Sequence, residues 1–303
     1  MNGNNRALHD KSGYVERKGT SIVSNINEKE KAPLDVNAPK KPFAKRFKKK
    51  YVSSAYWPSL AAFVGLFIIW ELSTMIFNIN PITLPAPSSV IQEFVSSFSF
   101  YITHAWVTLQ EAVLGFLLGM SVAIIMGVLM AHSSVLERTL LPIAVLANVT
   151  PIMAIAPLFI LWFGFDTLPK VLIAAIITFF PMLVNSIMGF RSIDENHYEY
   201  MRSLHASKLE IFIKLRFPNS LPYLFSAAKT CVSLSVMGAV VGEWSGATEG
   251  LGNVIMMASN YMQTNRMFAA IIMLAIMGIT LTNVVRYIEK KVLYWHVSAN
   301  NWN

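Results

Sequence analysis

Six long apolar stretches, separated by polar segments, dominate the chain after residue 50. Each holds at least the roughly 20 residues that a helix needs to cross about 30 Å of hydrocarbon. Their Leu, Ile, Met, Phe and Ala content lacks the two-residue alternation of membrane β-strands. The pattern predicts an all-α membrane protein with six transmembrane helices. The predicted spans cover residues 55–77, 105–131, 135–164, 168–190, 223–244 and 267–292.

The third stretch is interrupted by three prolines, Pro142, Pro151 and Pro157. Proline frees backbone carbonyls that must be satisfied inside the protein, so a broken membrane helix is expected to line a pathway or lie inside a bundle. Residues 84–101 are too short and too polar to cross, and they are predicted to lie at the outer surface. The second stretch carries glycines suited to close helix packing. They are Gly115, Gly119 and Gly127.

A polar segment, residues 191–222, separates the fourth and fifth stretches and carries nine charged residues. One charge at bilayer depth costs on the order of 3 kcal/mol, so this segment is predicted to be an aqueous loop. Apolar side chains that can act as anchors lie among the charges, and such anchors inside a polar rim suit a groove on a partner protein. They are Met201, Leu204, Leu209, Ile211 and Phe212. The alternative is a helix that lies on the lipid surface.

Composition and charge agree with a multi-pass protein of a prokaryotic plasma membrane. Hydrophobic residues make up 54% of the chain, mean hydropathy is +0.48 and the formal net charge is +8. Much of that charge lies within residues 40–50, directly before the first span, as the positive-inside rule and attraction to anionic membrane lipid require. Both termini are therefore predicted to be cytosolic. No nucleic-acid partner is expected.

The chain is expected to divide into three parts. Residues 1–50 are predicted to be a disordered basic cytosolic tail without a secretory signal, and residues 297–303 a short C-terminal tail. Residues 51–296 form the predicted transmembrane domain, which includes the 191–222 loop.

Catalytic chemistry is not indicated. The single cysteine, Cys231, lies in an apolar stretch and is interpreted as a small core residue. The chain has no metal-ligand spacing, no glycine-rich phosphate loop and no nucleophile elbow. The prediction is a protein that is not an enzyme, with no cofactor, no metal and no catalytic residue.

The 191–222 loop resembles the coupling loop of the membrane subunits of type I ATP-binding-cassette (ABC) importers. That loop reads Glu-Ala-Ala, three residues, Gly, nine residues, Ile-x-Leu-Pro. The matching residues, at intact spacing, are Glu199, Leu215, Phe217 and Pro218. Tyr200-Met201 replaces Ala-Ala, and His205 takes the glycine position at the bend between two short helices. A positive φ is expected there, which histidine tolerates less freely than glycine.

Further motifs are similar to the nitrate, taurine, sulfonate and thiamine-precursor branch of that family, and the resemblance covers residues 55–292. These motifs are Leu84-Pro85-Ala86-Pro87, the Pro-Leu-Phe-Ile-Leu-Trp-Phe-Gly of 157–164, Phe179-Phe180-Pro181 and Gly250-Leu251-Gly252.

The resemblance implies a permease subunit with the type I importer fold. It also implies a second copy of the chain or a close pseudo-dimer, two copies of an ATP-hydrolysing subunit and an extracellular solute-binding protein. ATP hydrolysis is then expected on the partner subunit. The residues implied in ATPase coupling are Glu199, Met201, Leu204, His205, Ala206, Phe212, Leu215 and Pro218.

Polar and aromatic residues inside the spans are candidates for the solute pathway. They are Glu111, Asn148, Thr150, Met153, Trp162, Glu243 and Trp244. Structural explanations stay open beside the functional ones. Glu71 and Glu243 also fit span ends, Lys229 also fits a side chain that reaches the cytosolic headgroups, and Asn185 also fits the satisfaction of broken helix backbone.

Glu111 gives the sharpest indication of the substrate. In the anion-transporting members that the chain resembles, the matching position tends to carry arginine. The first two spans contain no Lys or Arg, so the outer half of the pathway is predicted to repel anions and to admit a neutral or cationic solute. A pyrimidine-type thiamine precursor or a related vitamin heterocycle is therefore the predicted substrate.

Two alternatives remain open. An aliphatic sulfonate, taurine or nitrate fits if Glu111 is neutralised by Lys229 or by another chain. An ion-coupled secondary transporter, with Glu71 or Glu111 as a proton site, is the alternative of another class. Secondary carriers usually show internal repeats, and none is evident here.

Overall fold

The computed structural model describes residues 56–294, and within them every regular element is a helix. The predicted tails, 1–50 and 297–303, lie outside the described residues. In chain order the helices are α1 (Tyr56–Ile76), α2 (Pro87–Ser96), α3 (Phe98–His132), α4 (Ser134–Val149), α5 (Ile152–Phe163), α6 (Thr167–Arg191), α7 (Glu195–Ser203), α8 (Lys208–Ile211), a π-helix (Phe212–Arg216), α9 (Phe217–Trp244), α10 (Leu251–Asn260) and α11 (Thr264–Val292).

Four segments are long and apolar enough to cross a membrane: α3, α6, the continuous run from α8 through α9, and α11. The pair α4 and α5 passes the same criterion together but is bent by 97°, and the apolar part of α1, Leu60–Ile76, is shorter. The all-α membrane class is confirmed. Six crossings stay a prediction, because that count needs α4 and α5 to form one span and α1 to be another.

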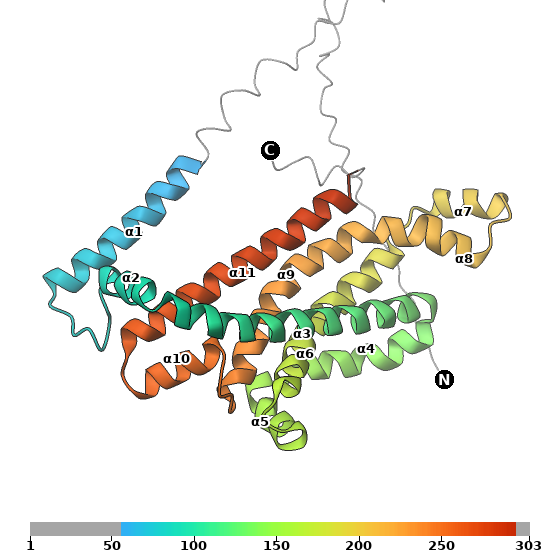
Figure 1. Cartoon of the computed structure of the whole chain (residues 1–303). Coiled ribbons are helices and arrows are strands. Elements are labelled where there is room, and N and C mark those ends of the chain that lie inside the picture. The colour runs from blue at the N-terminus through green and yellow to red at the C-terminus, as the bar shows by residue number, and fades with distance from the viewer. Residues whose placement is uncertain (1–55, 295–303) are drawn as a thin grey trace, which may run out of the picture. The chain divides into compact units, whose positions relative to one another are not determined.

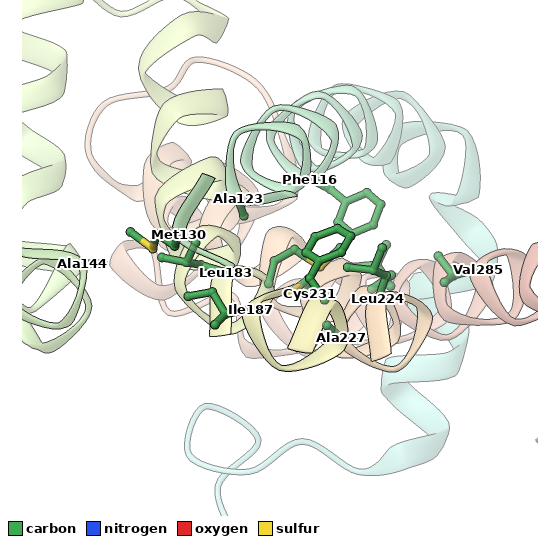
Figure 2. Packing of buried hydrophobic residues seen from close by; sticks show 14 residues of the cluster. Phe116, Ala123, Met130, Ala144, Leu183, Ile187, Leu224, Ala227, Cys231 and Val285 are labelled. Carbon is green, nitrogen blue, oxygen red and sulfur yellow. The ribbon is translucent and has the colours of Figure 1, made fainter. Parts of the chain in front are cut away.

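Helix α6 packs against both α3 and α9 (Figure 1). The glycines predicted to allow close packing do so, because a Cβ at any of them would overlap α6. The pairs are Gly115 with Ala174, Gly119 with Thr178 and Gly127 with Ser186. Figure 2 shows the buried cluster formed mainly by α3, α6 and α9, with Met130, Leu183 and Ile187 at one end and Phe116 and Leu224 toward the other. Cys231 is fully buried in it, and its thiol donates to the carbonyl of Thr178 at 3.4 Å, as expected of a core residue.

The third apolar stretch is broken once. Pro151 separates α4 from α5, whereas Pro142 and Pro157 lie inside those helices, so the prediction of interruptions at these two positions was wrong. Thr150 closes α4 with a backbone hydrogen bond to Leu146 at 3.2 Å, and Pro151 then serves as the N-cap of α5. A single internal proline removes only one backbone donor, which a helix packed in a bundle tolerates.

Two short helices lie at the opposite end of the bundle from α7 and α8. Helix α2 accounts for most of the predicted surface stretch 84–101, although residues from Phe98 onward already belong to α3. Helix α10 was not predicted. It packs against α9 and α11 and is ordered by polar contacts from α3 and α9, which a single-sequence pattern does not display.

Candidate functional site

The 191–222 loop folds into the two short helices expected of a coupling loop. Helix α7 begins after Asp194, whose carboxylate accepts a hydrogen bond from the amide of Asn196 at 2.9 Å. Ser207 and Glu210 form a capping box at the start of α8, with the Ser207 amide donating to Glu210 at 2.9 Å. These side chains satisfy free backbone donors at both helix starts, so the sequence specifies both helices locally.

His205 lies at the bend between α7 and α8 and has a φ of +56°. The positive φ expected at the family's glycine position is therefore present. The amide of His205 donates to the carbonyl of Arg202 at 2.9 Å, and the amide of Ala206 donates to Met201 at 3.1 Å. The bend keeps its hydrogen bonds and carries the strain of a left-handed histidine.

Replacing His205 with glycine is expected to stabilise the loop by about 0.5 to 1 kcal/mol, because glycine adopts a positive φ without a Cβ clash. His205→Val is expected to destabilise it, since a β-branched residue resists this conformation more than histidine does. Thermal unfolding of the purified protein in detergent tests both changes. Equal melting temperatures for the glycine and valine variants would contradict the account.

The apolar anchors of the loop divide into two groups. Leu204 and Leu209 are 60% and 66% exposed and remain available to a partner, while Met201 is half-buried. Ile211 is buried and Phe212 packs on Phe190 with ring centroids 5.8 Å apart, so the expectation that these two face a partner was wrong. Phe212 is the first residue of the π-helix, and the sequence pattern did not predict that its ring packs on the bundle.

Other loop residues complete this surface. Glu199, Tyr200 and His205 are exposed. In the sequence, Tyr200 stood out only because it departs from the family motif. Ala206, Leu215 and Pro218 are half-buried. The exposed apolar surface of the loop, formed by Tyr200, Leu204 and Leu209, is called the loop surface below.

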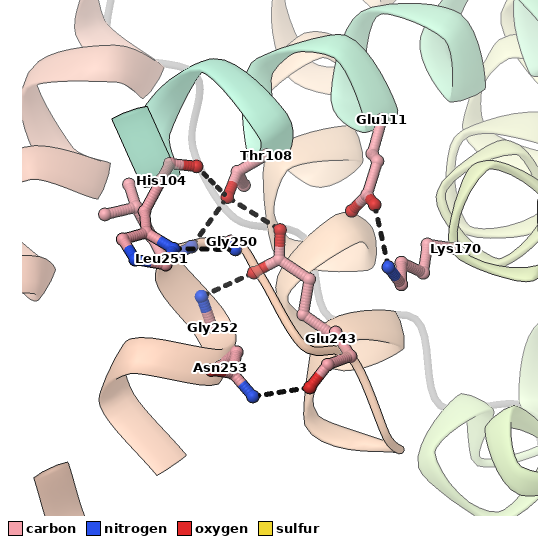
Figure 3. A network of polar contacts seen from close by, with 10 residues as sticks. His104, Thr108, Glu111, Lys170, Glu243, Gly250, Leu251, Gly252 and Asn253 are labelled. Atoms are coloured by element: carbon pink, nitrogen blue, oxygen red, sulfur yellow. Dashed lines mark hydrogen bonds and ion pairs between the residues drawn. The ribbon is translucent and has the colours of Figure 1, made fainter. Parts of the chain in front are cut away.

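Two of the predicted pathway residues, Glu111 and Glu243, lie where α3, α6 and α9 approach the start of α10 (Figure 3). Glu243, fully buried near the end of α9, accepts hydrogen bonds from Thr108 Oγ1 at 2.6 Å and from the amide of Gly252. Gly252 lies in the first turn of α10, so this carboxylate caps that helix. Gly250 has a φ of +104°, and a Cβ there would overlap the Glu243 carboxylate.

Glu111, on α3, is the other fully buried carboxylate of this region. Figure 3 shows it next to Glu243, which comes from α9. Lys170 Nζ lies 3.1 Å from Glu111 Oε1, and both side chains are buried. Neither Glu111 oxygen accepts a hydrogen bond from another described residue, so Lys170 is the group that compensates its charge. Lys170 falls inside the predicted span 168–190 and occupies the first turn of α6.

Lys229, the partner considered for Glu111, binds Glu289 of α11 instead, with both Nζ–Oε distances at 2.9 Å. Glu71 near the end of α1 accepts from the amide and the hydroxyl of Ser88 at 3.0 and 2.8 Å, in the first turn of α2. Glu71 and Glu243 therefore perform the same structural task for two short helices. The span-end explanation holds for both positions.

The remaining pathway candidates lie elsewhere. Asn148, Thr150, Met153 and Trp162 are exposed on α4 and α5, around the break at Pro151. Trp244 is partly exposed at the end of α9. The structure thus does not gather the predicted pathway set in one place within a single chain. Within residues 56–294, no group of three or more His, Cys, Asp or Glu side chains is arranged to hold a metal ion.

The fold and its loop define a class of membrane transport subunit, and comparison with known proteins gives the same class. Residues 115–294 match the family described as binding-protein-dependent transport system inner membrane component. The chain belongs to this family of ABC importer permeases, in the branch of the sulfonate, thiamine-precursor and nitrate proteins.

Two relatives and one solved structure illustrate the match. The formylaminopyrimidine transport permease protein ThiX of Halalkalibacterium halodurans is 32% identical over 234 residues, which are 77% of this chain and 93% of ThiX. The putative aliphatic sulfonates transport permease protein SsuC of Bacillus subtilis is 33% identical over 233 residues, which are 76% of this chain and 84% of SsuC. An inward-facing structure of the MetNI methionine ABC transporter aligns with a TM-score of 0.58 at 19% identity, covering 65% of this chain and 98% of that chain.

Proposed function

We propose that two copies of this chain form the translocation pathway of an importer whose ATP-hydrolysing subunits bind the loop surface and whose solute arrives on an extracytoplasmic binding protein. The observation that carries the proposal is the loop itself, which keeps the motif spacing, the bend at His205 and exposed apolar anchors at Leu204 and Leu209. Helix-in-groove binding needs this combination of rigid helices and apolar anchors. The proposal includes both termini in the cytosol, supported by the basic residues of the sequence before the first span, which suit anionic lipid there.

The break at Pro151 supports the second copy. The Asn148 amide and the non-helical backbone between Thr150 and Pro151 are exposed on one chain, and lipid cannot satisfy such groups. They require protein or a water-filled path against them. A partner copy facing α4 and α5 supplies both, and it places Met153 and Trp162 along the solute pathway.

A pyrimidine-type thiamine precursor or related vitamin heterocycle is the first candidate for the solute. The likeness to ThiX, named for formylaminopyrimidine, supports it. The exposed aromatic rings of Trp162 and Trp244 also offer stacking surfaces to a planar ring if they line the path.

An aliphatic sulfonate is the second candidate, favoured by a specific observation. The charge of Glu111, which argued against anions, is compensated by Lys170 at 3.1 Å. The buried carboxylate therefore presents no unpaired negative charge at this point of the chain, and the likeness to SsuC is of the same strength as that to ThiX.

Uptake by cells that express the chain with its cognate ATPase and binding protein tests the function. Labelled aminopyrimidine precursor is expected to accumulate, and the accumulation should stop on ATP depletion but persist when the proton gradient is collapsed. Accumulation of a labelled alkanesulfonate alone would select the second candidate. Uptake driven by the proton gradient without ATP would overturn the importer class for this chain.

A further inference from the structure

A cavity of about 410 Å³ lies at the end of the bundle opposite the loop surface, between the start of α3, helix α10 and the turn into α11. Its polar and aromatic lining comes from Phe100, His104, Asn253, Tyr261, Gln263 and Arg266. It is called the Arg266 cavity here. Its lining residues His104 and Asn253 belong to the polar network around Glu243 in Figure 3, but neither Glu111, Lys170 nor any residue of the α4–α5 break lines it.

Arg266 is held in place by contacts that leave some of its hydrogen-bond donors unused. Its Cζ lies 5.2 Å from the centre of the Phe100 ring, its Nε lies 3.6 Å from Glu93, and its Nη1 donates to Gln263 at 3.1 Å. A guanidinium carries five N–H donors, and its contacts with Gln263, Glu93 and the Tyr101 hydroxyl engage at most three of them. A fixed guanidinium with free donors is prepared to bind an oxygen-rich group in a forked geometry.

Arg266 also borders a second cavity of about 350 Å³, lined by Glu93, Gln263 and Asn265 among others. The buried Oδ1 atom of Asn265 has no hydrogen-bond partner among the described residues. The two cavities meet at Arg266 and Gln263, which line both. The polar groups around Arg266 therefore have unused hydrogen-bonding capacity on two sides.

Two further side chains give the Arg266 cavity a defined pattern of donors and acceptors. His104 Nδ1 accepts from the amide of Gly250 at 3.1 Å, so in the neutral ring the proton is on Nε2, which is a donor. Asn253 donates its amide N–H to the carbonyl of Ala247, which orients its Oδ1 as an acceptor. Phe100, packed edge-on against His104 at 4.5 Å, and the exposed Tyr261 supply apolar ring surface.

We propose that the Arg266 cavity is a binding site for a small organic solute that presents a carbonyl or sulfonate oxygen to Arg266 and packs its apolar or planar body against Phe100 and Tyr261. The solute is taken to be the transported one, so the inference rests on the proposed function in that respect. A formylated aminopyrimidine and an alkanesulfonate share this acceptor chemistry. The site would hold the solute at the entrance before it reaches the spans.

Binding to the purified full chain, in detergent and without ATPase or binding protein, tests this inference separately from transport. Isothermal titration with an aminopyrimidine precursor and with an alkanesulfonate is expected to show one of them binding. Arg266→Gln should weaken that binding at least about tenfold, and Arg266→Lys by a similar factor, because lysine keeps the charge beside Glu93 but loses the fork. Lys290→Gln, an exposed change at the other end of α11, is the matched control and should leave binding unaltered.

Three results would overturn the site. They are no binding of either probe, binding that Arg266→Gln and Arg266→Lys leave unchanged, or equal weakening by Lys290→Gln. Arg266→Lys keeps the inference testable if Arg266→Gln fails to fold. Uptake without measurable binding at Arg266 would contradict the binding site and leave the proposed importer function intact. Binding without ATP-driven uptake would contradict the importer function and leave the binding site intact.

Discussion

Lys170→Met is expected to destabilise the membrane domain by about 3 to 5 kcal/mol, because it leaves buried charge without a partner. Glu111 and Lys170 are both buried, and their charged atoms lie 3.1 Å apart between α3 and α6. Removing the lysine leaves the Glu111 carboxylate without a counter-charge in a region that also holds the buried Glu243. Thermal stability in detergent, followed by size-exclusion chromatography after heating, measures the loss.

The double variant Lys170→Met with Glu111→Leu should recover most of that stability, since replacing a whole buried ion pair with apolar groups is often neutral. Lys214→Met is the matched control. It breaks the exposed pair with Glu210 at 3.4 Å and is expected to change stability by no more than about 0.5 kcal/mol. A Lys170→Met protein as stable as the parent would show that Glu111 does not depend on this lysine.

The sequence identified Glu111 as unusual but not its partner. A buried ion pair between two helices depends on how α3 and α6 pack, and the 58 positions between Glu111 and Lys170 do not encode that packing in any recognisable pattern. The charge argument about the substrate missed this lysine for the same reason. It counted the basic residues of the first two spans, whereas the compensating charge comes from the start of α6.

Features that depend on local chemistry were predicted well. The loop spacing, the left-handed bend at His205 and the glycine seam of α3 follow from neighbouring residues or from a missing side chain, and the structure has all three. The helix bounds of α6 and α11 differ from the predicted spans by a few residues only.

Features that depend on distant contacts were missed. Helix α10 is ten residues long and is held at its start by Thr108 and Glu243, which lie on other helices. The 97° bend between α4 and α5 falls at one of three prolines that look alike in the sequence. The packing of Phe212 on Phe190 was missed as well, because it depends on how the end of α6 lies against the start of the π-helix.

Leu204→Asp combined with Leu209→Asp is expected to abolish stable binding of the ATP-hydrolysing subunit while the membrane domain stays folded. Both leucines are largely exposed on the loop surface, so the changes cost the isolated chain little. An interface anchor contributes about 2 kcal/mol or more, so losing two of them and burying two carboxylates should weaken association by far more than about 30-fold. Co-purification of the tagged chain with the co-expressed ATPase, together with ATPase activity in the eluate, measures the effect.

Phe212→Ala separates binding from folding in the same loop. Phe212 packs on Phe190 and Phe217 with ring centroids 5.8 and 6.4 Å apart, so its truncation should lower the melting temperature. The surviving folded protein should still retain the ATPase, because the loop surface is unchanged. If the Leu204 and Leu209 double variant co-purified with the ATPase as well as the parent does, the loop surface would not be the coupling contact. If Phe212→Ala instead lost the ATPase at an unchanged melting temperature, the coupling contact would extend to the base of α9.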